Sequence, residues 1–264
     1  MEVIVTGPHE VAPTAAAVVL DRLGRLARAA TRREPVLGLA TGSSPLGLYR
    51  ELAAAVADGR VDLAGAHGVA LDEYVGLPQG HPQSYRSILV REVGERLGVP
   101  PDRLEVPDGS GDTLEELETA AAAFERRIAA LGGIDLQILG IGANGHLGFN
   151  EPGSALASRT RVKRLSDRTR EDNARFFSGF DAVPTHSVTQ GLGTILEART
   201  LLLLATGEAK ARAVAAAVEG PLTSSCPASV LQWHPDVVVV LDEAAAAGLR
   251  NREYYAEAAA GLSR

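Results

Sequence analysis

Cysteine is almost absent from this sequence, with Cys226 the only one among 264 residues. A single thiol forms no intramolecular disulfide and supplies no cysteine framework for a metal, so Cys226 is expected to act as a small, half-buried hydrophobe. Long hydrophobic runs are also absent, and Leu201–Thr206 and Val237–Leu241 are far too short to span a bilayer. The first ten residues lack the positive and apolar stretches of an export signal. The sequence therefore predicts a cytoplasmic protein without a membrane partner.

Positive charge is scarce. Lys and Arg number 26 against 33 Asp and Glu, which gives a formal net charge of −7 at pH 7. No sustained basic stripe occurs, so a nucleic-acid partner is not expected. An acidic chain that binds an anion must concentrate a few cations at one place. Apolar residues, at 45% of the total, are enough for a sizeable core and exclude a disordered or fibrous protein.

Short β-branched runs alternate with alanine-rich stretches of helical length, a pattern typical of βαβ units in a parallel sheet. No fixed-period repeat or low-complexity linker divides the chain. We therefore predict an α/β fold with an open, doubly wound, mostly parallel sheet and helices on both faces (Rossmann-like), forming a single domain over residues 1–264. The expected strands are Met1–Thr6, Val36–Ala40, Val69–Leu71, Ile134–Ile141, Thr200–Thr206 and Val237–Leu241. The expected helices are Glu10 to about Arg32, Pro45–Ala57, Pro82–Leu97, Thr113–Leu131, Glu208–Glu219 and a C-terminal helix.

Three predicted strand ends carry unusual residues, and open α/β sheets bind ligands beyond the carboxyl ends of their strands. The first is the loop Thr41-Gly42-Ser43-Ser44, with Pro45 opening the following helix. Its backbone N–H groups, its hydroxyls and the positive end of the helix can cradle a phosphate. The alternative is an ordinary helix start that Ser44 caps. Because the loop lacks the lysine of a Walker A motif, a nucleoside triphosphate is not the expected ligand.

Two acids, Asp72 and Glu73, directly follow the second of these strand ends. At that position one of them can act as a general base toward a bound ligand. The alternative is a solvated pair that opens a loop, because most acidic residues are exposed.

The third strand end is rich in glycine, with four glycines from Gly140 to Gly148. Glycines at such density bring the backbone close to another group. His146 and Glu151 fall in the same irregular segment, where a carboxylate beside an imidazole can orient and tune it for moving protons. The alternative is a loop histidine with a structural role. A metal site is not expected, because the spacing of His146 and Glu151 comes without a convincing third ligand.

The cationic side chains that could bind an anionic ligand are isolated residues rather than a cluster. Arg175 falls in a helical stretch, Arg170–Phe177, and Lys210 falls early in the helix that follows Thr200–Thr206. A cation in the first turn of a helix opposes the macrodipole, so Lys210 indicates an anionic ligand. The alternative is a solvated surface lysine.

Five segments together resemble the glucosamine-6-phosphate deaminase family (glucosamine/galactosamine-6-phosphate isomerases), in order and over nearly the whole chain. They are LGLATGSSPLGLY (Leu37–Tyr49), LDEYVGLPQGHPQSY (Leu71–Tyr85), LGIGANGHLGFNEPGSALASRTRVK (Leu139–Lys163), THSVTQGLGTIL (Thr185–Leu196) and AVEGPLTSSCPASVLQWHPDVVVVLDE (Ala217–Glu243). LDEYVGL and GHLGFNEPGS are the most specific of these motifs. The resemblance implies an enzyme of amino-sugar catabolism that converts glucosamine 6-phosphate into fructose 6-phosphate and ammonia. It implies neither a metal nor another cofactor.

The resemblance also implies roles for individual residues. Asp72 is similar to the base that moves a proton from C2 to C1 of the open-chain sugar, and His146, held by Glu151, to the group that opens the pyranose ring. Asn144 stands where the family often has aspartate and some members have asparagine, so a positioning role is expected for it. A further hypothesis is that Tyr74–Tyr85 closes over the sugar as a lid that excludes water. The implied phosphate-binding set is Thr41, Gly42, Ser43, Ser44, Arg175 and Lys210.

Some members of this family bind N-acetylglucosamine 6-phosphate at a second, activating site. Ser154, Arg161 and Lys163 match positions of that site, and Arg161 and Lys163 alternate along an extended segment, so both can face one anion. Ala155 stands where those members can carry serine, and a solvated basic pair is the alternative. Such a site normally lies between subunits, so it would depend on a homo-oligomer, and the residues leave the oligomeric state open.

Two rival interpretations use the same residues. The 6-phosphogluconolactonases share the fold and a similar glycine–histidine loop, but Asp72–Tyr74 together with Asn150–Pro152 favours the deaminase. A non-catalytic sugar-phosphate sensor, like the effector domains of some bacterial repressors, normally carries an N-terminal helix-turn-helix, whereas a strand is predicted here from the first residues. The residues leave open whether glucosamine or galactosamine 6-phosphate is preferred.

Overall fold

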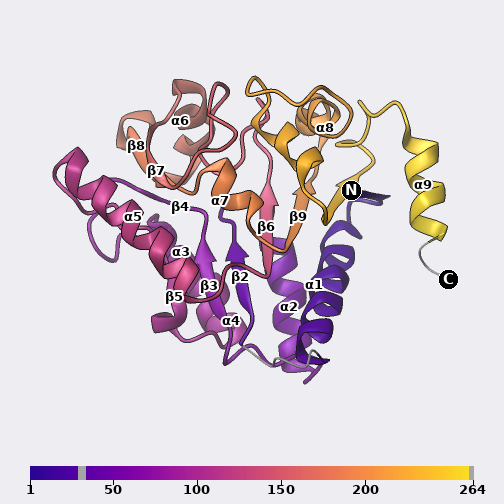
Figure 1. The fold of residues 1–264 in the computed structure, drawn as a ribbon, viewed down its shortest axis with the longest axis horizontal. Coiled ribbons are helices and arrows are strands. Elements are labelled where there is room, and N and C mark those ends of the chain that lie inside the picture. Colours follow the sequence, from indigo (N-terminus) through magenta and orange to yellow (C-terminus); the bar gives the residue numbers. More distant parts are fainter. Residues whose placement is uncertain (29–33, 262–264) are drawn as a thin grey trace.

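A seven-stranded parallel sheet forms the centre of the molecule (Figure 1). The structure is a computed structural model that describes residues 1–28 and 34–261. The strands are β1 (Glu2–Thr6), β2 (Val36–Leu39), β3 (His67–Ala70), β5 (Leu104–Glu105), β6 (Leu136–Gly140), β9 (Thr200–Ala205) and β10 (Val237–Asp242). They lie in the order β1-β10-β9-β6-β2-β3-β5, and every neighbouring pair is parallel. β2, β9 and β10 are buried along their whole length, as expected for a sheet covered on both faces.

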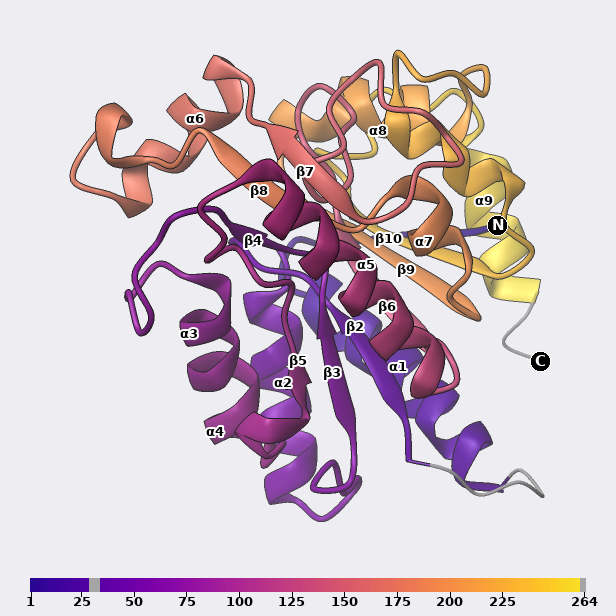
Figure 2. The same cartoon turned by 60° about the vertical axis from the view of Figure 1, so that its left-hand side comes forward.

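Helices cover both faces of this sheet. One set is α1 (Val11–Arg28), α2 (Leu46–Ala57), α3 (Tyr85–Leu89) and α4 (Glu95–Leu97), and the other is α5 (Leu114–Ala130), α7 (Leu192–Leu196) and α8 (Ala211–Val218). The chain crosses the sheet in one direction from β1 through β2 and β3 to β5, and returns through β6 and β9 to β10. Because connections between parallel strands are right-handed, the two halves place their helices on opposite faces. Figure 2 shows α1 and α2 behind the strands and α5 in front of them. The predicted doubly wound class is confirmed.

Local sequence signals explain where helices begin and what they bury. At the start of α5, the Thr113 hydroxyl accepts the N–H of Glu116 at 3.2 Å, and the Glu116 carboxylate accepts the N–H of Thr113 at 3.0 Å. This reciprocal capping box satisfies two backbone donors that the helix leaves unpaired. α1 places one apolar stripe against the sheet, as an amphipathic helix should. The stripe consists of Val11, Ala15, Val19 and Leu23.

The direction of the chain reverses between β2 and β6, which are neighbours in the sheet. The connection that leaves β2 covers one face, and the connection that leaves β6 covers the other. The loops after these two strands therefore diverge, and doubly wound sheets bind ligands at such a switch point. These are the loop Thr41–Ser44 and the glycine-rich segment that begins at Gly140.

A second, three-stranded antiparallel sheet lies beyond the carboxyl ends of the large sheet, and the sequence-based prediction does not contain it (Figure 1). It consists of β4 (Asp72–Tyr74), β8 (His186–Thr189) and β7 (Arg161–Arg164), in that order. The irregular segment predicted after the glycine-rich strand end therefore stops where β7 begins at Arg161, and β4 replaces the alternative of a loop that opens at Asp72. No apolar run marks β7, and Asp72 pairs with Thr189 from a distant part of the chain. Helix α6 (Asp167–Asn173) follows β7 and packs above this sheet.

Three helical segments complete the comparison with the sequence. The helix expected over Pro82–Leu97 begins at Tyr85 and contains a π-helical turn, Val90–Gly94, between α3 and α4. The expected C-terminal helix is α9 (Arg252–Gly261), which lies at the β1 edge of the sheet (Figure 1). The end expected for α1, near Arg32, lies outside the described residues.

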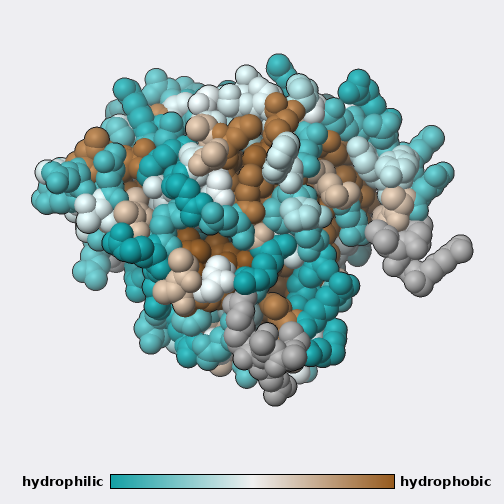
Figure 3. Space-filling model, in the orientation of Figure 1, coloured by the Kyte–Doolittle hydropathy of each residue, from teal (hydrophilic) through white to brown (hydrophobic). Residues whose placement is uncertain are grey.

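The surface is mostly hydrophilic, with a few separate hydrophobic areas on the face that Figure 3 shows. Cys226 belongs to the buried core, and a Cβ atom placed on Gly145 would lie 2.7 Å from its Sγ. Within residues 1–28 and 34–261, no helix is long and apolar enough to cross a membrane. Across the same residues, no group of three His, Cys, Asp or Glu side chains could hold a metal ion.

Candidate active site

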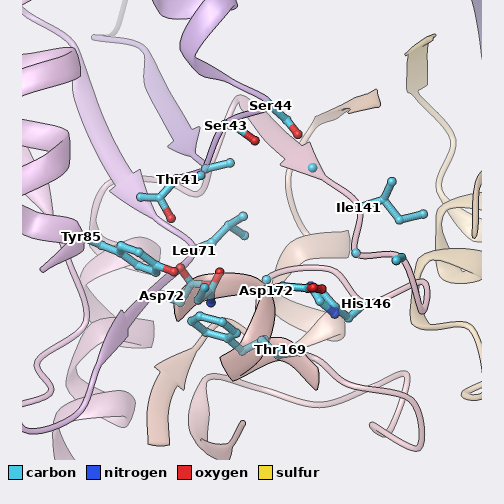
Figure 4. Close-up of a pocket in the computed structure, with 18 of the residues that line it drawn as sticks. Thr41, Ser43, Ser44, Leu71, Asp72, Tyr85, Ile141, His146, Thr169 and Asp172 are labelled. Carbon is cyan, nitrogen blue, oxygen red and sulfur yellow. The ribbon is translucent and has the colours of Figure 1, made fainter. Parts of the chain in front are cut away.

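A pocket of about 170 Å³ lies at the switch point between β2 and β6 (Figure 4). Its walls come from the loop after β2, the start of β4, the glycine-rich loop after β6, α6 and the turn before α8. Eight of the residues predicted for the substrate site line it: Thr41, Gly42, Ser43, Ser44, Asp72, His146, Arg175 and Lys210. Asn144 and Glu151 do not line the pocket and instead contact its wall at His146. The three residues predicted for a second site, Ser154, Arg161 and Lys163, do not line it either.

The loop Thr41–Ser44 forms one end of the pocket (Figure 4). Gly42 has a φ of +86°, a left-handed conformation that glycine adopts without strain. The loop leads into α2, a helix of 12 residues whose N-terminus carries a partial positive charge. No side chain caps this helix, so the alternative of an ordinary helix start that Ser44 caps is wrong. The Ser44 side chain instead lies at the pocket wall.

Two cations reach the same pocket from other elements. Arg175 lies in a 3₁₀ turn, Ala174–Phe176, directly after α6 rather than in the helix predicted for it. Lys210 ends another 3₁₀ turn, Glu208–Lys210, before α8. Burial lowers the pKa of Lys210 below its usual value, Asp172 opposes this shift, and Arg175 adds to it. An anion beside such a lysine favours its charged form, so the loop and the two cations together have the chemistry that an anion requires.

Asp72 and Glu73 have different surroundings although they are adjacent in β4. Asp72 lines the pocket, whereas the carboxylate of Glu73 accepts the backbone N–H groups of Tyr74, Tyr85 and Arg86 at 2.8, 2.9 and 2.9 Å. Glu73 therefore anchors the start of α3 and joins the two ends of the predicted lid. The two side chains belong to residues only 5% and 7% exposed, so the alternative of a solvated pair is wrong. Burial and then the charge of Glu73 raise the pKa of Asp72 well above its usual value.

His146 is backed by a carboxylate, as the sequence predicts. Its Nδ1 lies 3.8 Å from Oε2 of Glu151, and Asn144 connects the two residues. The Asn144 side chain donates from Nδ2 to Oε2 of Glu151 at 2.7 Å, and its Oδ1 accepts the backbone N–H of His146 at 3.2 Å. Glu151 only accepts hydrogen bonds in this arrangement, as an ionised carboxylate does.

The surroundings also set the protonation of this pair. Burial raises the pKa of Glu151, but the hydrogen bond from Thr169, the charge of His146 and the hydrogen bonds from Asn144 and Ser166 outweigh it, so this pKa lies below its usual value. Burial lowers the pKa of His146 below its usual value, mainly against the opposing charge of Glu151, and so favours the neutral imidazole. A proton on Nδ1, directed at Glu151, leaves the lone pair on Nε2.

The glycines of the loop make space for the functional side chains. A Cβ atom on Gly142 would lie 2.3 to 2.4 Å from atoms of the His146 ring. A Cβ atom on Gly148, which has a φ of +55°, would lie 3.2 Å from Oδ2 of Asp72. The expectation that these glycines bring the backbone close to another group is confirmed, and the groups are the imidazole and the carboxylate.

Four further residues with polar side chains line the pocket without having been predicted for the substrate site: Tyr85, Thr169, Asp172 and Asn173. Figure 4 shows the Tyr85 hydroxyl directed toward Asp72, and Asp172 beside His146. Tyr85 closes the LDEYVGLPQGHPQSY segment, so the motif contains a signal for it. Thr169 and Asp172 are three residues apart on α6, and only the knowledge that α6 covers the pocket would have found them.

The residues predicted for a second site lie on and before β7. Arg161–Arg164 forms this strand, so the predicted extended segment is confirmed. Among the described residues, Ser154 Oγ and Arg161 Nη2 are buried without a hydrogen-bond partner. Burial also lowers the pKa of Arg161. Buried polar atoms are nearly always hydrogen-bonded, so this region is suited to a ligand or a partner.

The fold and the pocket together define a class of protein. It is an α/β enzyme whose switch point carries a buried carboxylate, a neutral imidazole backed by a second carboxylate, and an anion site. Groups of this kind move protons on a small anionic molecule.

The comparisons with known sequences narrow this class. The model of the family described as glucosamine-6-phosphate isomerases/6-phosphogluconolactonase matches residues 8–240, and the chain belongs to this family. It is 57% identical over 229 residues to the glucosamine-6-phosphate deaminase of Streptomyces avermitilis, which covers 86% of this chain and 87% of the relative. It is 51% identical over 257 residues to that of Pseudarthrobacter chlorophenolicus, covering 97% and 95%.

Solved structures agree with this assignment. A monomeric glucosamine-6-phosphate deaminase matches with a TM-score of 0.86 at 37% identity, over 94% of this chain and 100% of that one. The 6-phosphogluconolactonase of Trypanosoma cruzi matches with a TM-score of 0.77 at 22% identity, over 94% and 97%, and this likeness concerns the fold. The predicted family is confirmed.

The contact between Gly142 and the imidazole generates a first prediction. In Gly142→Ala the new methyl group displaces the His146 ring, and a shift of about 1 Å costs roughly 10²-fold in kcat. The measurement is ammonia release from glucosamine 6-phosphate, the substrate of the relatives. Gly7→Ala is the control, because nothing lies within 4 Å of a Cβ atom there. Wild-type kcat in Gly142→Ala would contradict the position described for His146.

Asn144 generates a second prediction, for the pH dependence. In Asn144→Asp a second carboxylate lies within hydrogen-bonding distance of Glu151, and its negative charge raises the pKa of His146. Because neutral His146 is then available only at higher pH, the acid limb of kcat/KM should move up by roughly one pH unit. Asn251→Asp adds the same charge on an exposed residue and should leave the profile unchanged. An acid limb that stays in place or moves down would contradict the proposed contact.

Proposed function

We propose that this protein is a glucosamine-6-phosphate deaminase that converts its substrate and water into fructose 6-phosphate and ammonia. The observation that carries the proposal is that one pocket combines the buried Asp72, the His146–Glu151 pair and the anion site. Relatives that bear the name of this activity, with 57% and 51% identity, support it.

His146 opens the pyranose ring in this proposal. Ring opening takes a proton from the anomeric hydroxyl and delivers one to the ring oxygen, and a neutral imidazole can do both. The lone pair of Nε2 accepts the proton, and the ionised Glu151 stabilises the imidazolium that forms. Asn144 holds Glu151 in position through its 2.7 Å hydrogen bond.

Asp72 then moves a proton from C2 to C1 of the open-chain sugar. Loss of the C2 proton gives an enolamine, and return of the proton at C1 gives the imine of the ketose. Water hydrolyses this imine to fructose 6-phosphate and ammonia. A carboxyl group whose pKa burial has raised suits this task, because the base must both take and return a proton near neutral pH.

The phosphate at C6 binds at the other end of the pocket in this proposal. The phosphate-binding set is the loop Thr41-Gly42-Ser43-Ser44 with Arg175 and Lys210. A phosphate dianion there stabilises the charge of Lys210, which burial disfavours, and fixes the sugar against Asp72. Phosphorylated sugars are charged and therefore stay inside cells. Because the proposed substrate is such a sugar, we also propose a cytoplasmic location for the protein.

The rival functions account for fewer of these residues. A lactonase hydrolyses an ester and needs no base above C2, so the buried Asp72 would have no task in it. The lactonase structure, at 22% identity, supports a common fold and nothing further. A binding protein would require the anion site but neither Asp72 nor the His146–Glu151 pair.

The decisive experiment compares wild type with Asp72→Asn. Wild type should release ammonia and fructose 6-phosphate in equal amounts from glucosamine 6-phosphate, and Asp72→Asn should lose about 10²- to 10⁴-fold in kcat, the usual contribution of a general base. Asp181→Asn, on an exposed residue outside the pocket, is the control for the charge change. A folded wild type that releases neither product but hydrolyses 6-phosphogluconolactone would show the rival to be correct.

We further propose that Ser154, Arg161 and Lys163 bind a second phosphorylated sugar, N-acetylglucosamine 6-phosphate, as an activator. The unpartnered Ser154 Oγ and Arg161 Nη2 support this, because a phosphate would supply the acceptors that these two donors lack. We also propose that a second copy of the chain completes this site, in a homo-oligomer.

This second site has its own test. N-acetylglucosamine 6-phosphate should lower the KM of the wild type severalfold, and Arg161→Gln should abolish the response while keeping basal activity. Arg164→Gln removes an exposed arginine from the same strand and should respond as the wild type does. Light scattering on the same samples measures the number of copies. If N-acetylglucosamine 6-phosphate left the KM of the wild type unchanged, the activator role would be ruled out.

A further inference from the structure

Two hydroxyl groups of α6 contact the carboxylate behind the imidazole. The Thr169 hydroxyl donates to Oε1 of Glu151, and Ser166 Oγ lies 2.9 Å from the same oxygen and 3.0 Å from Thr169 Oγ1. Ser166 is also the N-cap of α6, since its Oγ accepts the N–H of Thr169 at 3.2 Å. The first turn of α6 and the Glu151 carboxylate are therefore one hydrogen-bonded unit.

The other end of the same helix reaches the anion site. α6 has only seven residues, and Arg175 lies in the 3₁₀ turn that directly follows it. At this end, Nδ2 of Asn173 donates to the Tyr74 hydroxyl at 3.1 Å, and the Tyr85 hydroxyl lies 3.2 Å from the same oxygen. One short helix and the turn that follows it thus connect the cation Arg175 with Glu151.

The imidazole–carboxylate pair is not closed in this arrangement. The distance from His146 Nδ1 to Glu151 Oε2 is 3.8 Å, which is too long for a hydrogen bond. Among the described residues, His146 Nδ1 is one of the buried polar atoms without a partner. A buried donor left unpaired costs free energy, so a small movement of Glu151 toward His146 would be favourable.

We propose that Ser166 and Thr169 are positioning residues that couple phosphate binding at Arg175 to closure of the His146–Glu151 hydrogen bond. A phosphate that draws Arg175 inward moves α6, and the two hydroxyls carry Glu151 with it. This inference rests on the proposed function, because it assumes that His146 opens the ring. The hydrogen bond from Thr169 is also the first of the influences that hold the pKa of Glu151 down against burial.

The coupling has a consequence for how binding energy is used. Contacts with a remote phosphate accelerate a reaction only when they act on the reacting groups. If α6 transmits them, the loss of Thr169 should lower kcat and leave KM nearly unchanged, because the phosphate still binds. A purely structural helix would instead change KM, stability or both.

The first experiment is a set of matched variants assayed on glucosamine 6-phosphate. Thr169→Val keeps the shape but removes the hydroxyl and should lower kcat by about 10- to 100-fold, the cost of a misplaced catalytic group. The acid limb, which reports the protonation of His146, should move down, because Glu151 that is no longer held in place stabilises the imidazolium less. Thr169→Ser restores the hydroxyl and should recover most of kcat. The control is Thr119→Val, which makes the same change on an exposed face of α5.

Ser166 needs a substitution that separates its two roles. Glycine at an N-cap costs a helix only a few tenths of a kcal/mol, so Ser166→Gly removes the contact with Glu151 and largely keeps the start of α6. Its kcat should fall in the same sense as that of Thr169→Val, with a melting temperature close to that of the wild type. Wild-type kcat in both variants would overturn the inference.

The second experiment measures, in the absence of substrate turnover, how phosphate binding affects His146. Inorganic phosphate is titrated into the protein while the ring nitrogens of His146 are followed by NMR, with His146→Gln assigning the signals. In the wild type, phosphate should shift the Nδ1 resonance toward that of a hydrogen-bonded imidazole. In Thr169→Val, phosphate should still bind but leave this resonance in place. The proposed coupling would be overturned if bound phosphate did not shift the Nδ1 resonance of the wild type. It would also be overturned if phosphate shifted this resonance equally in the wild type and in Thr169→Val.

The two proposals fail in different ways. A wild type that releases no ammonia refutes the proposed function, whatever the NMR titration gives. An active wild type whose Thr169→Val variant matches it in kcat, acid limb and titration refutes the coupling alone.

Discussion

The reversal of chain direction between β2 and β6 is the constraint on which the site depends. Because crossover connections are right-handed, this reversal forces the loops after the two strands to opposite faces of the sheet. The gap that they leave is open to solvent at its mouth and walled by buried strands below. The loop Thr41–Ser44 enters this gap from the β2 side, whereas His146, Arg175 and Lys210 come from the part of the chain that follows β6.

Three buried or half-buried carboxylates surround this gap, and their hydrogen bonds separate their tasks. Glu73 is saturated by backbone N–H groups and anchors α3. Glu151 is held by an amide and two hydroxyls, which keep it charged behind His146. For Asp72, burial and the charge of Glu73 are the causes of its raised pKa, and within residues 1–28 and 34–261 no hydrogen bond offsets them. Of the three carboxylates, Asp72 is thus the one whose surroundings favour the protonated form most, which is the property that the proposed function requires of it.

The sequence predicts the large sheet well because its strands are continuous apolar runs separated by helices. It predicts the pocket for the same reason, since Thr41, Asp72 and His146 each follow such a run. It does not predict the second sheet, whose strand β7 reads Arg-Val-Lys-Arg and pairs only through tertiary contacts. Nor can it predict which of two adjacent acids serves as a helix anchor, because the donors to Glu73 come from Tyr85 and Arg86, twelve and thirteen positions along the chain.

The packing of Cys226 against Gly145 makes the one thiol of this protein a natural reporter. Its sulfur lies 2.7 Å from the point where a Cβ atom on Gly145 would be, so it packs beside the loop that carries His146, and burial raises its pKa and disfavours the reactive thiolate. A thiol reagent reaches the buried Cys226 sulfur when this loop opens locally. The rate at which Cys226 is alkylated therefore measures how often the loop opens, without any label or substitution. A sugar phosphate that stabilises the loop would lower this rate.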